Sequence, residues 1–195
     1  MAIFTQPGAI LTIVFMPANI GMSLSHNSLL HIGFMPEAEK INPQIMEAYL
    51  QMRDTDFLKC SHFFGGRFEN RYLAREFIPS INTVLTQAEA LAKKILLDSS
   101  QYLRSGFWIN DMGPNESTTE HNHDDYDELL SGVYYVQVPE DSGDLVIVDP
   151  NSRTLVTPQA GMFVFFAPAV LHSVSVNLSK DRRVSLGMNF GPVSG

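Results

Sequence analysis

The sequence contains a single cysteine, Cys60, so no disulfide can form within the chain. A chain without disulfides fits a reducing compartment, and we expect it in the cytoplasm. No apolar run reaches the ~20 residues that a membrane span requires. The longest run near the start, residues 9–16, has the length of a strand. The first residues also lack the basic segment that opens a signal peptide, so we expect neither a signal peptide nor a membrane span.

Basic residues are scarce as well: 13 lysines and arginines stand against 21 acidic residues, which gives a net charge of -8. This balance argues against a nucleic acid as the main partner, because the phosphate backbone attracts basic surfaces. The composition, 45% hydrophobic and 17% charged, is that of a globular protein. From 195 residues we expect one domain, 1–195, that folds without structural metal. Any bound metal must then serve chemistry.

The first hundred residues combine a strand with two helices. Residues 9–16 predict a buried strand. Asn42 and Pro43 predict a helix start, with Asn42 as N-cap, and the helix should run to about Arg53. A second helix is expected to start at Thr86, in the capping-box pattern TQAE. Both helices should pack against a sheet.

After residue 102 the sequence becomes rich in short β-type runs separated by Gly, Pro, Asn and Asp. We expect seven strands, at 104–111, 130–138, 144–149, 153–157, 161–166, 171–176 and 182–190. An eight-stranded jelly roll needs one more strand, which the N-terminal half can supply. The predicted fold is therefore mainly β, a jelly-roll core over 102–195, with residues 1–101 packing on it, completing it and adding the flanking helices.

The densest polar stretch is EHNHDD at 120–125. In extended conformation His123 and Asp125 project from the same face, and His172, which begins a later strand, is a candidate third ligand. Two imidazoles and a carboxylate suit non-haem Fe(II), because they leave coordination positions open. Alternatively, EHNHDD is a solvated acidic loop and His172 an ordinary strand residue.

Ten residues, 173–182, separate His172 from the alternating strand RVSLGMNF, which begins at Arg183. Alternation places Arg183 and Ser185 on one face together with small and polar residues. A guanidinium and a hydroxyl on one face can grip a carboxylate with charge-assisted hydrogen bonds. The alternative is an exposed arginine at the end of a polar loop, because KDRR at 180–183 has that composition.

The order and spacing of these motifs resemble a known family. FWIN, LSGVYYVQVPEDSGDLVIVDP, PQAGMFVFFAPAVLHSV and RVSLGMNF, between Phe107 and Phe190, are similar to a family of 2-oxoglutarate/Fe(II) oxygenases of bacteria and phages. The resemblance implies a double-stranded β-helix fold, ferrous iron, and oxidation of a second substrate by dioxygen. Oxidative decarboxylation of 2-oxoglutarate to succinate and CO2 would accompany that oxidation.

Carried over by position, the resemblance makes His123, Asp125 and His172 the catalytic iron ligands. Further positions implied to bind the cosubstrate are Arg183, Ser185, Tyr135 and Asn110, with Trp108 beside them in the cavity wall. Many relatives have HxH rather than HxD before the SGVYY strand, so a two-residue insertion would select His121 and His123 in place of His123 and Asp125.

Two other classes stay open. A cupin would use His121, His123, Glu128 and His172 as metal ligands and would leave Arg183 without a role. A non-catalytic jelly-roll module would need no metal at all. The prime substrate, a small molecule or a protein side chain, is not readable from the sequence. Neither is the role of residues 61–72, which predict a substrate loop or a turn between packed elements.

Overall fold

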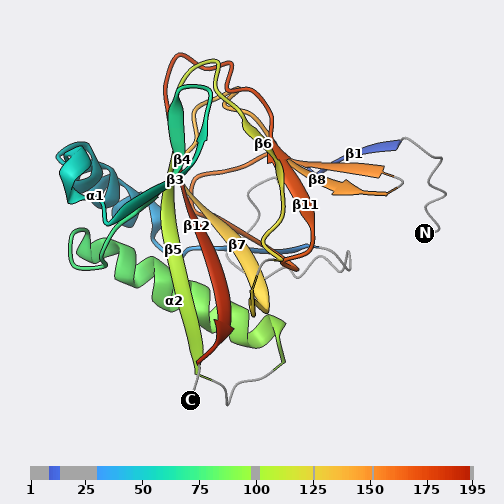
Figure 1. Cartoon of the computed structure of the whole chain (residues 1–195), viewed down its shortest axis with the longest axis horizontal. Coiled ribbons are helices and arrows are strands. Elements are labelled where there is room, and N and C mark those ends of the chain that lie inside the picture. Colours follow the sequence, from blue (N-terminus) through green and yellow to red (C-terminus); the bar gives the residue numbers. More distant parts are fainter. Residues whose placement is uncertain (1–8, 14–29, 98–101, 125, 151, 194–195) are drawn as a thin grey trace.

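The computed structural model describes residues 9–13, 30–97, 102–124, 126–150 and 152–193, and its strands form two sheets (Figure 1). The five-stranded sheet has the order β1 (Ala9–Ile13), β9 (Ser152–Val156), β8 (Leu145–Asp149), β11 (Leu171–Val174), β6 (Thr118–His121). The seven-stranded sheet has the order β2 (His31–Phe34), β10 (Met162–Phe166), β7 (Leu130–Gln137), β12 (Arg183–Pro192), β5 (Leu103–Met112), β4 (Arg67–Tyr72), β3 (Lys59–Phe64). All pairings except β1 with β9 are antiparallel.

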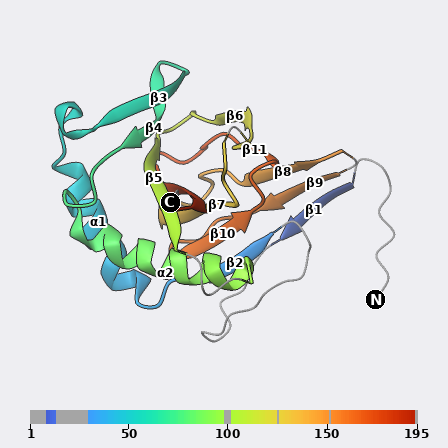
Figure 2. The same ribbon diagram turned by 60° about the horizontal axis from the view of Figure 1, so that its bottom comes forward.

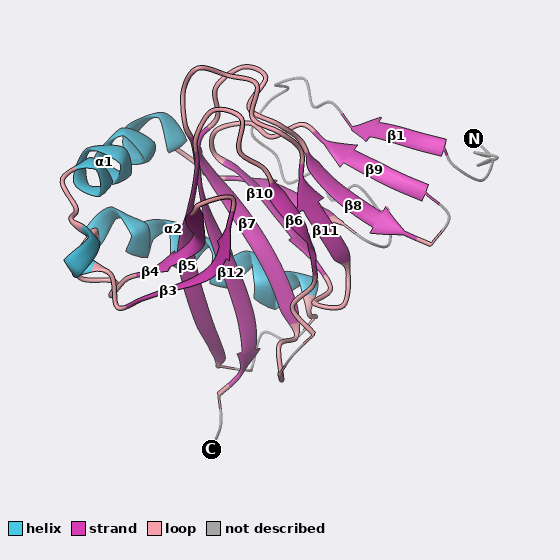
Figure 3. Cartoon of the chain, turned by 45° about the horizontal axis from the view of Figure 1, so that its top comes forward, coloured by secondary structure: helices cyan, strands magenta, loops and turns pink. Residues whose placement is uncertain are grey.

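The two sheets form a jelly roll (Figure 3), and apolar side chains between them join them into one core. Leu145 and Ile147 of β8 alternate inward, as a strand with one buried face requires, and meet Val164 of β10 and Tyr135 of β7. The predicted mainly β fold is therefore confirmed. A cavity opens between the sheets, beyond the end of this apolar core.

Two helices, α1 (Ala38–Leu50) and α2 (Pro79–Ile95), cover the outer face of the seven-stranded sheet (Figure 2). A single 3-10 turn, η1 (Asp54–Asp56), follows α1. The buried residues of α2 recur every three or four positions and form one stripe against the sheet: Ile81, Val84, Leu85, Ala88, Leu91 and Ala92. None of the described helices is long and apolar enough to cross a membrane.

The predicted start of the first helix is wrong. Helix α1 begins at Ala38 and contains Pro43, and Asn42 caps nothing. Its side chain is buried instead: Nδ2 donates to the Val136 carbonyl at 2.8 Å, and Oδ1 accepts from the Tyr134 hydroxyl at 2.5 Å. Asn42 therefore has a tertiary role, because it bonds two buried polar groups of β7, although in the sequence it looks like an N-cap residue.

The predicted start of the second helix is also wrong, because α2 begins at Pro79 rather than at Thr86. Thr86 lies exposed in the middle of the helix. Glu89, the other half of the supposed capping box, accepts a hydrogen bond from Ser105 of β5 at 2.6 Å. Proline at the first helical position is a start signal that the prediction passed over.

The seven strands predicted after residue 102 are all present, as β5 and β7 to β12. The N-terminal half supplies β1 to β4 rather than one strand, and β6 (Thr118–His121) is not among the expected strands. The strand expected at 9–16 is observed as β1, Ala9–Ile13, and residues 14–16 lie outside the described residues.

Candidate metal and cosubstrate site

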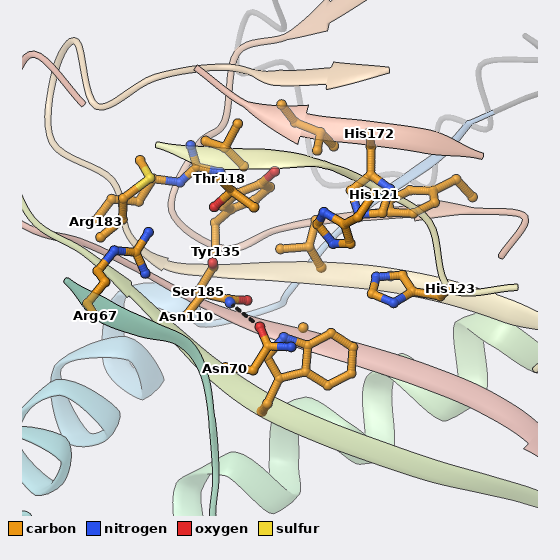
Figure 4. A pocket seen from close by; sticks show the side chains of 18 residues that line it. Arg67, Asn70, Asn110, Thr118, His121, His123, Tyr135, His172, Arg183 and Ser185 are labelled. Atoms are coloured by element: carbon orange, nitrogen blue, oxygen red, sulfur yellow. Dashed lines mark hydrogen bonds between the residues drawn. The ribbon is translucent and has the colours of Figure 1, made fainter. Parts of the chain in front are cut away.

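Three histidines meet at one end of the cavity (Figure 4). His121 at the end of β6 is the direct cross-strand partner of His172 on β11, so both side chains project from the same face. His123 lies two residues further along and returns to that side, held by a backbone hydrogen bond from its N–H to the Pro168 carbonyl at 2.8 Å. One ring nitrogen from each histidine lies within 4.8 Å of the others.

Backbone carbonyls orient two of these rings. Nδ1 of His121 lies 2.8 Å from the Thr119 carbonyl, and Nδ1 of His172 lies 3.0 Å from the Val170 carbonyl. A carbonyl only accepts, so Nδ1 carries the proton in both rings and Nε2 keeps its lone pair. This arrangement prepares imidazole to ligate a metal through Nε2.

Burial keeps two of the histidines neutral. It lowers the pKa of His172 to about 3, with a further contribution from the nearby His121 ring. Burial also lowers the pKa of His123 to about 4, and the His121 and His62 rings lower it further. Imidazole binds metal in its neutral form, so these rings are ready ligands at neutral pH.

The third predicted ligand, Asp125, lies outside the described residues, so the carboxylate prediction is not tested. The described cluster is the HxH pair His121 and His123 together with His172. Glu128, the fourth ligand of the cupin alternative, is not a member of it. Its carboxylate lies 4.0 Å from Arg104 instead.

Arg183 lies at the other end of the cavity and is only 3% exposed. Its Nη1 donates to the Gly143 carbonyl at 2.8 Å, and its Cζ lies 4.9 Å from the centre of the Tyr135 ring. Burial lowers the pKa of Arg183, yet among the described residues no carboxylate forms a salt bridge with it. The exposed-loop alternative for Arg183 is therefore wrong. A buried guanidinium without a salt-bridge partner is a site that an anion would complete.

Ser185, Asn110 and Tyr135 lie side by side on three neighbouring strands. Ser185 of β12 is the cross-strand partner of Asn110 on β5 and of Tyr135 on β7. The Tyr135 hydroxyl is buried without a hydrogen-bond partner among the described residues, and burial raises its pKa. The structure thus brings all four predicted cosubstrate-binding residues to one cavity.

Trp108 forms the wall between the two ends. Its ring centre lies 5.4 Å from that of His123. A Cβ atom added to Gly187 would lie 2.3 Å from Trp108 Cε2, so the indole packs directly on the backbone of β12. Glycine at this position of RVSLGMNF is what gives the indole room.

Sequence reasoning missed part of the cavity wall. Arg67 and Asn70 of β4 line it, as does Thr118 of β6, and the whole cavity measures about 650 Å³ including its open mouth. The Asn110 amide donates to the Glu69 carbonyl at 2.7 Å and to Asn70 Oδ1 at 2.9 Å, which fixes its orientation (Figure 4). The signal in the sequence was Gly65-Gly66: both have positive φ and form the two-residue turn of the β3–β4 hairpin.

Comparison with known proteins gives one family and one fold. Residues 106–157 match the family described as "Putative 2OG-Fe(II) oxygenase". Among curated proteins, no relative matches the chain. A 2OG-Fe(II) oxygenase family oxidoreductase from Burkholderia pseudomallei has a similar structure, with a TM-score of 0.67, 14% identity, and coverage of 96% of this chain and 97% of that one.

Two further solved structures share the fold. A prolyl hydroxylase from Trichoplax adhaerens, in complex with a hypoxia inducible factor peptide fragment, aligns with a TM-score of 0.66 at 9% identity, over 85% of this chain and 84% of that one. EvdO2 from Micromonospora carbonacea var. aurantiaca, complexed with 2-oxoglutarate, aligns with a TM-score of 0.60 at 14% identity, over 84% and 86%.

The fold is a double-stranded β-helix, and its cavity contains three histidines whose ring nitrogens lie close enough together to bind one metal ion. The family resemblance seen in the sequence is confirmed over residues 106–157, which match the 2OG-Fe(II) oxygenase family, and the fold is shared with solved 2OG-Fe(II) oxygenase structures.

Proposed function

We propose that this protein is an oxygenase that uses Fe(II), 2-oxoglutarate and dioxygen to hydroxylate an organic substrate. One oxygen atom enters a substrate C–H bond, and the other enters succinate as 2-oxoglutarate loses CO2. The proposal is carried by the groups at the two ends of the cavity. The three-histidine cluster lies at one end. At the other end lies the buried Arg183 guanidinium, which has no carboxylate partner among the described residues.

In this proposal His123 and His172 ligate the iron together with a third group from the same segment. We take His121 as that third ligand, because its Nδ1 already bonds a carbonyl and its ring stands 4.3 Å from that of His172, centre to centre. Asp125, predicted from the sequence, is the competing ligand. The iron, when bound, supplies the redox chemistry that protein side chains lack.

Arg183 would bind the distal carboxylate of 2-oxoglutarate, with hydrogen bonds from Ser185 and from the Tyr135 hydroxyl. This role would give a carboxylate to a guanidinium that has no salt bridge among the described residues, and an acceptor to the buried Tyr135 hydroxyl, which has no hydrogen-bond partner there. Asn110, with both amide hydrogens already donated, offers its remaining oxygen to the cavity. The surrounding apolar residues exclude water, which strengthens each of these polar contacts.

The prime substrate in this proposal is a small molecule or a protein side chain. For the location we propose the cytoplasm, on the single free cysteine.

The test is anaerobic addition of Fe(II) and then 2-oxoglutarate to the full chain. We expect a visible charge-transfer band that needs both additions, and succinate formation once oxygen is admitted. Arg183→Lys should weaken 2-oxoglutarate binding about tenfold or more, because a point charge replaces a two-pronged donor. Arg53→Lys, at an exposed position that does not line the cavity, is the matched control. Normal 2-oxoglutarate affinity in Arg183→Lys would contradict the assignment.

A further inference from the structure

Arg67 is a second guanidinium in the cavity wall that the proposed function leaves unused. It comes from β4, directly after the hairpin turn at Gly65-Gly66, and its side chain is 13% exposed. Figure 4 shows it on the same side of the cavity as Arg183, away from the histidines.

Two of the three guanidinium nitrogens of Arg67, Nε and Nη2, have polar contacts within the described part of the chain, and the third does not. Nε lies 2.9 Å from Glu116 Oε2, Nη2 donates to the Ser117 carbonyl at 3.1 Å, and Nη2 lies 3.7 Å from Glu69 Oε1. Nη1 is buried and has no hydrogen-bond partner among the described residues. A buried donor without an acceptor costs stability, and such groups in native proteins call for a ligand or a bound water.

The charge around Arg67 selects the kind of acceptor. Two carboxylates, Glu69 and Glu116, already face this guanidinium, so their sum with Arg67 is negative. A third carboxylate arriving from a ligand would be repelled by both. Arg183, in contrast, has no salt bridge within the described residues. The two arginines are therefore suited to different oxygens, charged at Arg183 and uncharged at Arg67.

We propose that Arg67 determines substrate specificity by donating from Nη1 to an uncharged carbonyl oxygen, so that the prime substrate presents an amide. The inference rests on the proposed function, because it assigns the 2-oxoglutarate carboxylate to Arg183. Apolar surface adjoins this donor: Phe64 is the cross-strand partner of Arg67 and is 43% exposed, and Phe68 beside it is 42% exposed. The fitting class is an amide that carries an apolar side chain.

The test compares two probes that differ at one group, N-methyl-4-methylpentanamide and 4-methylpentanoic acid, so that only the first probe presents an amide carbonyl beside the same apolar chain. Binding to the full chain, loaded with Zn(II) and the inert analogue N-oxalylglycine, is followed by the fluorescence of Trp108, the single tryptophan. We expect the amide to bind at least about tenfold more tightly, the value of one hydrogen bond to a charged donor. Arg67→Lys, which keeps the charge that Glu69 and Glu116 need, should remove that preference, and Arg53→Lys should retain it.

Glu116→Gln adds a readout that a purely structural role would not change. Removing one carboxylate leaves Arg67 with more positive charge, so the affinity for the acid should rise while thermal unfolding reports an intact fold. Three results would each overturn the proposal. The acid could bind the unmodified protein as tightly as the amide or more tightly, the amide could fail to bind, or Arg67→Lys could lower the affinity for both probes equally. Repeating the titration without Zn(II) and N-oxalylglycine separates its failure from failure of the oxygenase chemistry, because Nη1 does not depend on the metal.

Discussion

At the scale of single residues, the third metal ligand decides which reading of EHNHDD is right. His172→Ala should abolish tight metal binding under either assignment, because His172 belongs to both ligand sets. If His121 is the third ligand, His121→Ala should weaken metal binding at least about tenfold and Asp125→Ala should not. Isothermal titration with Zn(II) or anaerobic Fe(II) measures this directly. The reverse order of the two variants would restore the carboxylate assignment, and unchanged affinity in His172→Ala would reject both.

Gly187 sets the position of Trp108. In Gly187→Ala the new methyl group would lie 2.3 Å from the indole, so the ring must move out of its place in the cavity wall. We expect shifted Trp108 emission and a loss of about 1 to 3 kcal/mol in the free energy of unfolding. Gly106→Ala, on neighbouring β5, is the control, because a Cβ atom there meets nothing within 4 Å. Equal emission spectra for both variants would contradict this account.

Most of the cavity could be predicted from the sequence because its residues follow strand alternation. Arg183 and Ser185 were placed on one face by counting along a single strand, and the structure confirms that they line one cavity. Arg67 was included only in a segment, 61–72, predicted as a substrate loop or a turn, and its place in the cavity could not be predicted for a physical reason. Its contacts with Glu116 and Ser117 join segments about fifty positions apart, and no periodicity within one segment reveals such a contact.

At the scale of elements, helix α1 continues through Pro43, a residue that disfavours the interior of a helix. Proline in the interior of α1 has no N–H for the carbonyl one turn earlier, and its side chain is exposed. Pro43→Ala should therefore raise the free energy of unfolding by roughly 1 to 3 kcal/mol. Chemical denaturation monitored by circular dichroism measures it. Gln44→Ala, the neighbouring exposed position, is the control and should change the free energy of unfolding by less than about 0.5 kcal/mol. If Pro43→Ala raised the free energy of unfolding by no more than Gln44→Ala does, this account of Pro43 would be wrong.

Strands were easier to predict than helix starts in this chain. Each strand after residue 102 is bounded by Gly, Pro, Asn or Asp, so local chemistry limits its length. The helices begin where packing on the sheet allows. Asn42 is fixed by β7 and Glu89 by Ser105, so residues with capping chemistry serve tertiary contacts instead. Strand β6 escaped prediction because its four residues, TTEH, gain their pairing only from β11.

At the scale of the whole molecule, the buried histidines couple stability to pH. The pKa of His172 is about 3 in the folded protein, against an ordinary value of 6.5. Below pH 6.5 the unfolded chain therefore binds a proton that the folded protein does not, until the pH approaches 3. The contribution of the neutral His172 ring to the free energy of unfolding is fully present above pH 6.5. It is lost as the pH falls through this window, by up to about 1.4 kcal/mol per pH unit for one histidine.

Urea unfolding of the metal-free protein at pH 7.5 and at pH 5.5 tests this coupling. We expect a lower free energy of unfolding at pH 5.5, by about 1.4 kcal/mol from His172 alone. His123, whose pKa is also lowered, to about 4, acts in the same direction. In His172→Gln the difference between the two pH values should shrink, because one of the two titrating groups is gone. The same pH difference in both proteins would contradict this account, because it would mean that His172 takes up a proton equally readily in the folded and unfolded states.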